Sequence, residues 1–296
     1  MPTAMTPHTI LGVESRFSVA VRGGVLTGIR CRSGEPLLVL HGGPGLTDYS
    51  GMLAAELTGW DALRYTQRGV APSVTAGPFT VSQHVSDALA ILDHHGVSAA
   101  VVLGHSWGGY LAMQLAAAAP DRVRALVLVD TLGATGDGGL AGFAAALTAR
   151  SAPGALSRAA ELDALAAARP GTPESDAAAA ESLRLTWPAY FADPQAAPEP
   201  PPGLRFDHVC YTETFESITA ARATGLLPAQ LAECARPVEI VAGEASPFPL
   251  DVARATAAVF PGALVTVAGN AGHFPWVEQP GCVTAALGRV QARLPG

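Results

Sequence analysis

Short apolar runs alternate with helical segments over the first part of the chain, and this alternation limits which folds the chain can adopt. The runs at 36–40, 99–103 and 123–129 show no alternation of polar and apolar residues, which is typical of strands covered on both faces. Helices are predicted between them, at 81–95 and 107–119. Strands that alternate with helices indicate a parallel sheet with helices on both faces.

The alternation stops after residue 133. Residues 134–235 contain alanine-rich helical stretches and a proline-rich bend, but no convincing strand. Strands are predicted again at 238–242 and 263–267. Open α/β sheets bind ligands at the carboxyl ends of their strands, so we expect residues 134–235 to form a helical cap over that edge. The core domain would then comprise residues 1–133 and 236–296.

The charged residues exclude several classes of function. All 18 positively charged residues are arginines, so the chain has neither a P-loop lysine nor a Schiff-base lysine. A net charge of −7 without a basic cluster argues against nucleic acid as a partner. No apolar run approaches the roughly 20 residues of a membrane-spanning helix, and the N-terminal residues do not resemble a signal peptide. A cytoplasmic protein that does not bind membranes is expected.

The four cysteines are Cys31, Cys210, Cys234 and Cys282. They lie far apart and form no C-x-x-C pair, so neither a zinc site nor a disulfide framework is predicted. A chain of 296 residues can bury enough surface to fold without such links. We therefore expect isolated buried thiols and no metal.

The strongest local signal is the sequence GHSWGG from Gly104 to Gly109. It follows a predicted buried strand and opens a predicted helix, which is the context that a nucleophile elbow requires. Gly104 and Gly108 lie two residues on either side of Ser106, so no side chain crowds the sharp turn. A dinucleotide-binding loop would need glycine at the position of Ser106. Ser106 is therefore the predicted nucleophile.

A second motif, HGGPG, occupies residues 41–45 directly after a predicted strand. An acyl-transfer enzyme needs two backbone N–H donors aimed at the oxyanion of its tetrahedral intermediate. Gly43 is predicted to supply one donor, and Trp107, the residue after the nucleophile, the other. His41 is predicted to brace this loop by hydrogen bonds.

A third motif surrounds His273, which lies between Gly272 and Phe274 after the last predicted strand. A serine hydroxyl needs an imidazole to accept its proton near neutral pH. The position of His273 late in the chain fits the order nucleophile, acid, histidine. His105 adjoins the elbow and is predicted to be structural, whereas the role of His208 stays open.

With these motifs the chain resembles the α/β-hydrolase superfamily, and most closely its proline iminopeptidase-like branch. The resemblance includes Gln67-Arg68-Gly69 with Ser73 following, and it covers residues 16–133 and 236–294. It implies an α/β-hydrolase fold without a cofactor. It also implies a serine hydrolase that cleaves an ester or amide of a small molecule, or the N-terminal residue of a short peptide, through an acyl-enzyme. Esterases and lactonases share the motifs, and a non-hydrolytic acyltransferase, lyase or cyclase is the alternative.

The carboxylate that orients the catalytic imidazole is absent from its usual place. In the family, an aspartate usually follows the first strand after the cap in a Gly-x-x-Asp pattern, whereas here Ser246 occupies that position. Asp130, at the end of the preceding strand, is the first choice, because some superfamily members carry their acid there. Asp251 and Glu244 are the reserve candidates, and a dyad without an acid is a further alternative.

The cap also departs from the family's pattern. Proline iminopeptidases hold the free amine of the substrate with acidic cap residues, and their usual Glu-Asn-His-Tyr-Phe sequence is absent here. Glu213 and Glu216 are candidates for this role, because residues three apart share a helix face. A solvated face is the alternative. Trp187, Tyr190 and Phe191 are candidates for an apolar wall of the substrate site, with ordinary packing as the alternative.

Overall fold

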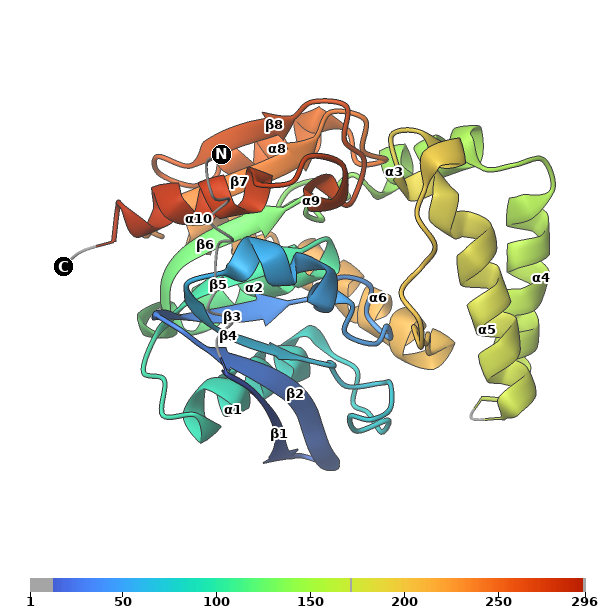
Figure 1. Ribbon diagram of the computed structural model, residues 1–296, viewed down its shortest axis with the longest axis horizontal. Helices are drawn as coiled ribbons and strands as arrows, with labels where there is room; N and C mark the ends of the chain where they lie inside the picture. Colours follow the sequence, from blue (N-terminus) through green and yellow to red (C-terminus); the bar gives the residue numbers. More distant parts are fainter. Residues whose placement is uncertain (1–12, 171, 295–296) are drawn as a thin grey trace, which may run out of the picture.

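The computed structural model describes residues 13–170 and 172–294 and contains one eight-stranded sheet (Figure 1). Its strands are β1 (Val13–Val21), β2 (Gly24–Arg32), β3 (Glu35–Leu40), β4 (Trp60–Tyr65), β5 (Ala100–His105), β6 (Val123–Val129), β7 (Val238–Gly243) and β8 (Leu264–Ala268). They are ordered β1-β2-β4-β3-β5-β6-β7-β8. Strands β1, β2 and β4 pair antiparallel, and all pairs from β4 to β8 are parallel. The predicted parallel sheet is confirmed over that part.

Helices cover both faces of the sheet, as the alternation predicted. On one face lie α1 (Val81–His94), α2 (Trp107–Ala118) and α8 (Leu250–Ala257). On the other lie the 3-10 helix η1 (Ser50–Leu57), α9 (Pro275–Glu278) and α10 (Cys282–Gln291). A short turn of 3-10 helix, η2 (Pro120–Arg122), leads into β6.

Between β6 and β7 the chain is helical. This part comprises α3 (Leu140–Arg150), α4 (Ala155–Ala168), α5 (Pro173–Thr186), η3 (Trp187–Tyr190), η4 (Pro194–Ala196), α6 (His208–Ala223) and α7 (Leu226–Ala232). Helices α4 and α5 pack against each other and stand at one side of the molecule, on the right in Figure 1. The chain then returns through α6 and α7 to the sheet.

The spacing of Glu213 and Glu216 implied a helix here but not its extent, and the composition of α6 explains why its bounds were not predicted. Its buried residues are Cys210, Thr214 and Ile218, which have helical spacing but include only one large apolar side chain. The helix begins after Asp207, whose carboxylate accepts a hydrogen bond from the Cys210 amide at 2.7 Å, as is typical of an N-cap. A cap aspartate followed by a weak apolar stripe is a faint signal in a sequence.

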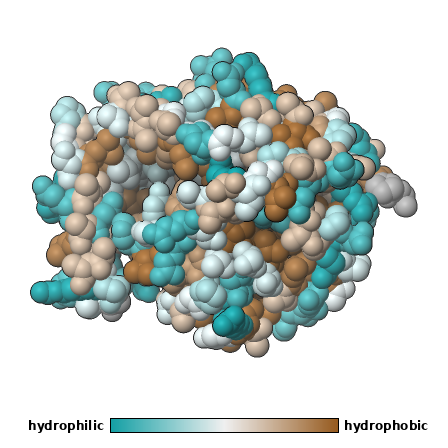
Figure 2. All heavy atoms as spheres, turned by 180° about the vertical axis from the view of Figure 1, so that it is seen from behind, coloured by the Kyte–Doolittle hydropathy of each residue, from teal (hydrophilic) through white to brown (hydrophobic). Residues whose placement is uncertain are grey.

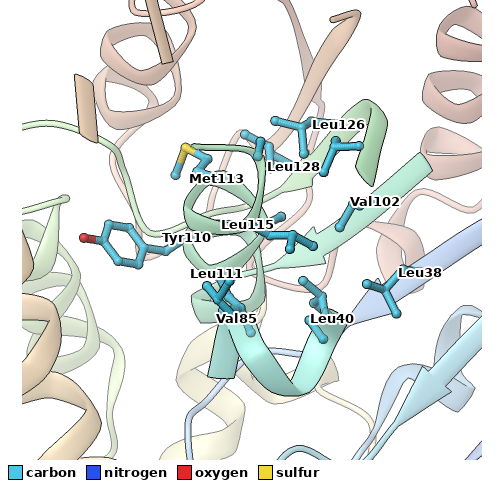
Figure 3. Close-up of a cluster of buried hydrophobic side chains, with 14 of the residues drawn as sticks. Leu38, Leu40, Val85, Val102, Tyr110, Leu111, Met113, Leu115, Leu126 and Leu128 are labelled. Atoms are coloured by element: carbon cyan, nitrogen blue, oxygen red, sulfur yellow. The ribbon is translucent and has the colours of Figure 1, made fainter. Parts of the chain in front are cut away.

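The core between α2 and the sheet is closely packed (Figure 3). The side chains labelled there come from α1, α2, β3, β5 and β6. Seven of the labelled leucines and valines are fully buried, namely Leu38, Leu40, Val102, Leu111, Leu115, Leu126 and Leu128. Burial of each such side chain contributes about 1.5–3 kcal/mol. This packing holds the first turn of α2 against the ends of β3 and β5, where the elbow motif lies.

Figure 2 shows one face of the molecule, seen from behind the view of Figure 1. Hydrophilic and hydrophobic residues are interspersed over the face shown. Across residues 13–170 and 172–294, no helix combines the length and the apolar character that a bilayer crossing demands.

Candidate functional site

Ser106 lies at a sharp turn between β5 and α2. Its φ angle is +55°, a left-handed conformation that non-glycine residues adopt rarely and at a cost in free energy. Hydrogen bonds hold the turn in place: the Ser106 amide donates to the Val129 carbonyl at 3.0 Å, and the Gly109 amide donates to the Ser106 carbonyl at 3.0 Å. The strained conformation is therefore fixed by neighbouring backbone on two sides.

Glycines make this turn possible, as the sequence predicted. A Cβ atom on Gly108 would lie 2.0 Å from the Leu40 carbonyl oxygen, and one on Gly104 would lie 2.2 Å from the Gly108 carbonyl oxygen. Both distances are far shorter than van der Waals contact, and both involve backbone atoms that cannot move aside. The first turn of α2 can approach β3 and β5 this closely only with glycine at these positions.

His273 and Asp130 are in direct contact. His273 Nδ1 lies 2.5 Å from Asp130 Oδ2, and both side chains are buried. Asp130 follows β6 directly and is held there by the Gly243 amide, which donates to Oδ1 at 3.1 Å, and by the hydroxyl of Ser246, which donates to Oδ2. The structure thus brings together the predicted histidine and the first-choice acid, and Ser246 supports that acid from the position where the family usually has its own.

The two reserve acids lie elsewhere. Asp251 is exposed on α8, where its carboxylate accepts a hydrogen bond from Arg254 at 3.1 Å. Glu244 is also exposed, and its carboxylate accepts from the Asn270 amide at 3.0 Å. Among the described residues, Asp130 is the one carboxylate that pairs with His273.

The HGGPG motif carries Gly43, one of the two predicted backbone N–H donors. Gly43 has a φ angle of +60°, and both Gly43 and Trp107 line the same pocket as Ser106 and His273. The N–H groups of the first turn of a helix have no acceptor within the helix, and this applies to Trp107 at the start of α2. A negatively charged oxygen near Ser106 would face the positive end of the α2 dipole.

His41 braces this loop. Its Nε2 accepts a hydrogen bond from the Gln67 amide at 3.1 Å, and its Nδ1 lies 2.9 Å from the Gly42 carbonyl oxygen. Burial lowers the pKa of His41, so the neutral ring can accept at one nitrogen and donate at the other. Gln67 also accepts a hydrogen bond from the Trp107 indole at 2.8 Å. Gln67 therefore joins His41, in the loop that carries Gly43, to the side chain of Trp107.

A chain of hydrogen bonds through Tyr49, which the sequence did not predict, connects three loops of the site. The Tyr49 hydroxyl accepts from the Gly42 amide at 2.7 Å and lies 2.5 Å from His105 Nδ1, while His105 Nε2 lies 2.7 Å from the His273 carbonyl oxygen. Burial, together with the neighbouring His273, lowers the pKa of His105, so its ring is neutral. These hydrogen bonds connect the loops that carry Gly43, Ser106 and His273. No local motif marks Tyr49, because its partners are distant in the sequence.

The pocket at this site has a volume of about 130 Å³. It is comparable to an apolar cavity of roughly 150 Å³ that binds benzene. Its wall is mostly apolar and aromatic, and includes Leu132, Leu140, Phe143, Leu183, Phe215, Phe248 and Phe274. Trp187 and Tyr190 also line it, as expected, whereas Phe191 does not. Phe191 is buried behind the wall and stacks on Phe274 with ring centroids 5.4 Å apart.

Glu213 and Glu216 do not reach the pocket, which corrects the expectation that they share a helix face pointing into the site. Both are exposed on α6, whose inward side carries Thr214 and Ile218. Tyr211 and Phe215 are the residues of this helix that line the pocket. The two glutamates face solvent because their position on the helix turns them away from the packed side.

No group of three or more histidine, cysteine, aspartate or glutamate side chains in residues 13–170 and 172–294 is arranged to hold an ion. The pocket wall itself contains His273 but no carboxylate, arginine or cysteine. The polar side chains at this apolar pocket are those of Ser106 and His273 and the phenols of Tyr49, Tyr190 and Tyr211.

Residues 35–280 match the family model described as alpha/beta hydrolase fold. Curated relatives match over shorter segments. Lipase LipV of Mycobacterium tuberculosis is 54% identical over 55 residues, which is 19% of this chain and 21% of that protein. A putative carbamate hydrolase, RutD, of Azorhizobium caulinodans is 34% identical over 100 residues, or 33% of this chain and 38% of that protein. The chain thus spans about a fifth to two fifths of the length of these relatives.

Solved structures match over nearly the whole chain. The 2-hydroxy-6-oxo-6-phenylhexa-2,4-dienoate hydrolase of Rhodococcus sp. strain RHA1 has a TM-score of 0.68 and 19% identity, covering 95% of this chain and 100% of that one. A hydrolase of Pseudomonas aeruginosa has a TM-score of 0.62 and 26% identity, covering 93% and 98%. These comparisons confirm the predicted fold.

Proposed function

Because the chain belongs to the α/β-hydrolase family, we propose that it is a serine hydrolase that cleaves an ester or amide of a small molecule through an acyl-enzyme. The observation that carries the proposal is the 2.5 Å contact between His273 Nδ1 and Asp130 Oδ2, at the edge of the pocket that Ser106 also lines. This contact leaves Nε2 as the nitrogen of His273 that can accept a proton. The strained turn at Ser106 adds independent support.

In the proposed mechanism, Ser106 Oγ attacks the carbonyl carbon of the substrate while His273 Nε2 takes the hydroxyl proton. Asp130 keeps the proton of His273 on Nδ1 and stabilises the imidazolium that forms. The Gly43 and Trp107 N–H groups donate to the oxyanion. The imidazolium then protonates the leaving group, and a water molecule that gives its proton to His273 attacks the acyl-enzyme and releases Ser106.

The apolar wall of the pocket supports a substrate with a small uncharged apolar group next to the scissile carbonyl. A charged group that enters such a chamber loses its hydration, and this is costly unless an opposite charge compensates it. No carboxylate lines the wall to pair with a cation. Relatives named as a carbamate hydrolase and a 2-hydroxymuconate semialdehyde hydrolase also act on small molecules. We therefore favour a small-molecule esterase over the proline iminopeptidase-like branch, whose substrates carry a free amine beside the cleaved amide.

A paired kinetic screen tests this preference. Purified protein is assayed with p-nitrophenyl esters of short acyl chains and with p-nitroanilides of proline and alanine. We expect measurable turnover of the esters and little of the anilides. Faster cleavage of the anilides, abolished when their α-amine is acetylated, would instead support the peptidase branch.

Replacing Ser106 with alanine should abolish labelling by a fluorophosphonate probe. The hydroxyl oxygen displaces fluoride and forms a phosphorus–oxygen bond, a reaction that depends on an activated serine. The measurement is the intact mass of the protein after incubation with the probe. Ser86→Ala is the matched control, because Ser86 is an exposed serine on α1 whose hydroxyl donates to the Ser82 carbonyl. Wild type and Ser86→Ala should gain one adduct, whereas an adduct retained in Ser106→Ala would contradict the proposal.

A further inference from the structure

A second chamber adjoins the pocket at the candidate active site. It has a volume of about 240 Å³ and lies among α4, α5 and the start of α6. Five residues line both cavities, namely Gly43, Leu46, Leu183, Tyr190 and Tyr211. A substrate whose carbonyl lies at Gly43 can therefore extend into either cavity, with a different part in each.

The chemistry of the second chamber differs from that of the first. Asp163, which projects from α4, lines it and is half-buried. Within residues 13–170 and 172–294, this carboxylate has no ion pair and accepts no hydrogen bond from a side chain, and no arginine lines the chamber. A half-buried carboxylate without a partner loses part of its hydration and gains nothing in return. It is therefore a charge that a ligand cation can neutralise.

Aromatic rings surround the same space. Tyr190, Phe206 and Tyr211 all line the chamber, and the rings of Phe206 and Tyr211 lie 5.4 Å apart. Burial, followed by the negative charge of Asp163, raises the pKa of the Tyr211 phenol, and both residues line the chamber. Aromatic faces attract organic cations, and the attraction increases when water is excluded.

A polar atom without a partner also lines this region. His208 contributes to the chamber, and its Nδ1 is buried without a hydrogen-bond partner in the part of the chain that the structure describes. A buried ring nitrogen of this kind needs a partner. A ligand with polar hydrogen atoms, or a water molecule held by the ligand, would provide one.

We infer that the second chamber binds an alkylammonium group of the substrate, with Asp163 as its counter-ion and Tyr190, Phe206 and Tyr211 as aromatic walls. The inference rests on the proposed function, because it places the apolar part of the same substrate in the pocket beside Ser106. It assigns a positive charge at one end of the molecule and an apolar group at the other. It also gives α4 and α5 a role in the choice of substrate.

Two pairs of isosteric esters test the inference. In each pair a trimethylammonium group is compared with a neutral tert-butyl group of the same shape, placed in the alcohol part in one pair and in the acyl part in the other. The wild-type protein should prefer the charged ester of one pair by about tenfold in kcat/KM, as expected for a partly desolvated cation beside a carboxylate and aromatic rings. Asp163→Asn should remove most of that preference.

Glu161→Gln is the matched control. Glu161 lies on the same helix, but its carboxylate is exposed and pairs with Arg158 at 3.2 Å, so this variant should keep the wild-type preference. Tetramethylammonium chloride provides a second measurement, since it should inhibit hydrolysis of the charged ester competitively in wild type and about tenfold less well in Asp163→Asn. Sodium chloride at the same concentration serves as the control for ionic strength.

The ester pairs and the fluorophosphonate probe report on different parts of the site. Equal kcat/KM values within both pairs, without inhibition by tetramethylammonium, would overturn the alkylammonium site while leaving a Ser106-dependent esterase intact. A preference that persists in Asp163→Asn would also overturn it. If the folded wild-type protein did not react with the fluorophosphonate probe, by contrast, the proposed function itself would be wrong.

Discussion

Replacement of Asp130 with asparagine is expected to lower kcat by about 1,000- to 10,000-fold. Asparagine preserves the size of the side chain, but its amide cannot stabilise the imidazolium of His273 and favours the wrong tautomer of the ring. Hydrolysis of a p-nitrophenyl ester measures the loss, and circular dichroism checks that the variant folds. The effect is large because His273 Nδ1 has its 2.5 Å contact with this carboxylate.

The two reserve acids provide the controls. Asp251→Asn and Glu244→Gln should keep wild-type turnover, because both side chains are exposed and bond to Arg254 and to the Asn270 amide instead. Loss of activity in Asp251→Asn but not in Asp130→Asn would show that Asp130 is not the acid. A dyad without an acid would leave all three variants active.

A double variant tests the geometry more closely. The hydroxyl of Ser246 donates to the same oxygen of Asp130 that contacts His273, so an aspartate at position 246 would place a carboxylate near the imidazole. Asp130→Asn combined with Ser246→Asp should therefore recover part of the activity lost in Asp130→Asn alone. No recovery would mean that the path from position 246 to His273 is blocked.

The core of the fold was predictable because its signals are local. Continuous apolar runs predict strands that are covered on both faces. The three runs at 36–40, 99–103 and 123–129 lie in β3, β5 and β6 of the structure. The glycines at the elbow reveal a close backbone approach, since a Cβ on Gly108 would meet the Leu40 carbonyl oxygen. Apolar runs and the space that a backbone contact needs can both be inferred from the residue types at these positions, without knowledge of distant contacts.

The walls of the site were less predictable because they depend on contacts between distant residues. Tyr49 and His105 are 56 positions apart and yet hydrogen-bond, and nothing near Tyr49 in the sequence indicates this. The orientation of α6 is set by the packing of Thr214 and Ile218, so the spacing alone could not show that Tyr211 lines the pocket and Glu213 does not. The extent of the cap, residues 134–235, remains a prediction.

Replacement of Arg68 with leucine is expected to lower the free energy of unfolding by about 3–5 kcal/mol. Arg68 and Asp87 are both buried, and two parallel hydrogen bonds join them: Arg68 Nε to Asp87 Oδ2 at 2.5 Å and Nη2 to Oδ1 at 2.8 Å. Arg68 Nη1 also donates to the Ala76 carbonyl at 3.1 Å. The loss is large because the variant leaves the Asp87 carboxylate in the interior without its counter-ion. Urea denaturation followed by tryptophan fluorescence measures it.

Two comparisons separate this effect from a general intolerance of arginine substitutions. Arg254→Leu removes an ion pair with Asp251 in which both side chains are largely exposed, so its cost should stay below about 1 kcal/mol. Arg68→Leu combined with Asp87→Leu should cost less than Arg68→Leu alone, because removing both charges leaves none unpaired in the interior. If the double variant were instead the less stable of the two, the main contribution of Arg68 would come from its hydrogen bonds to the Ala76 and Arg22 carbonyls and not from the buried ion pair.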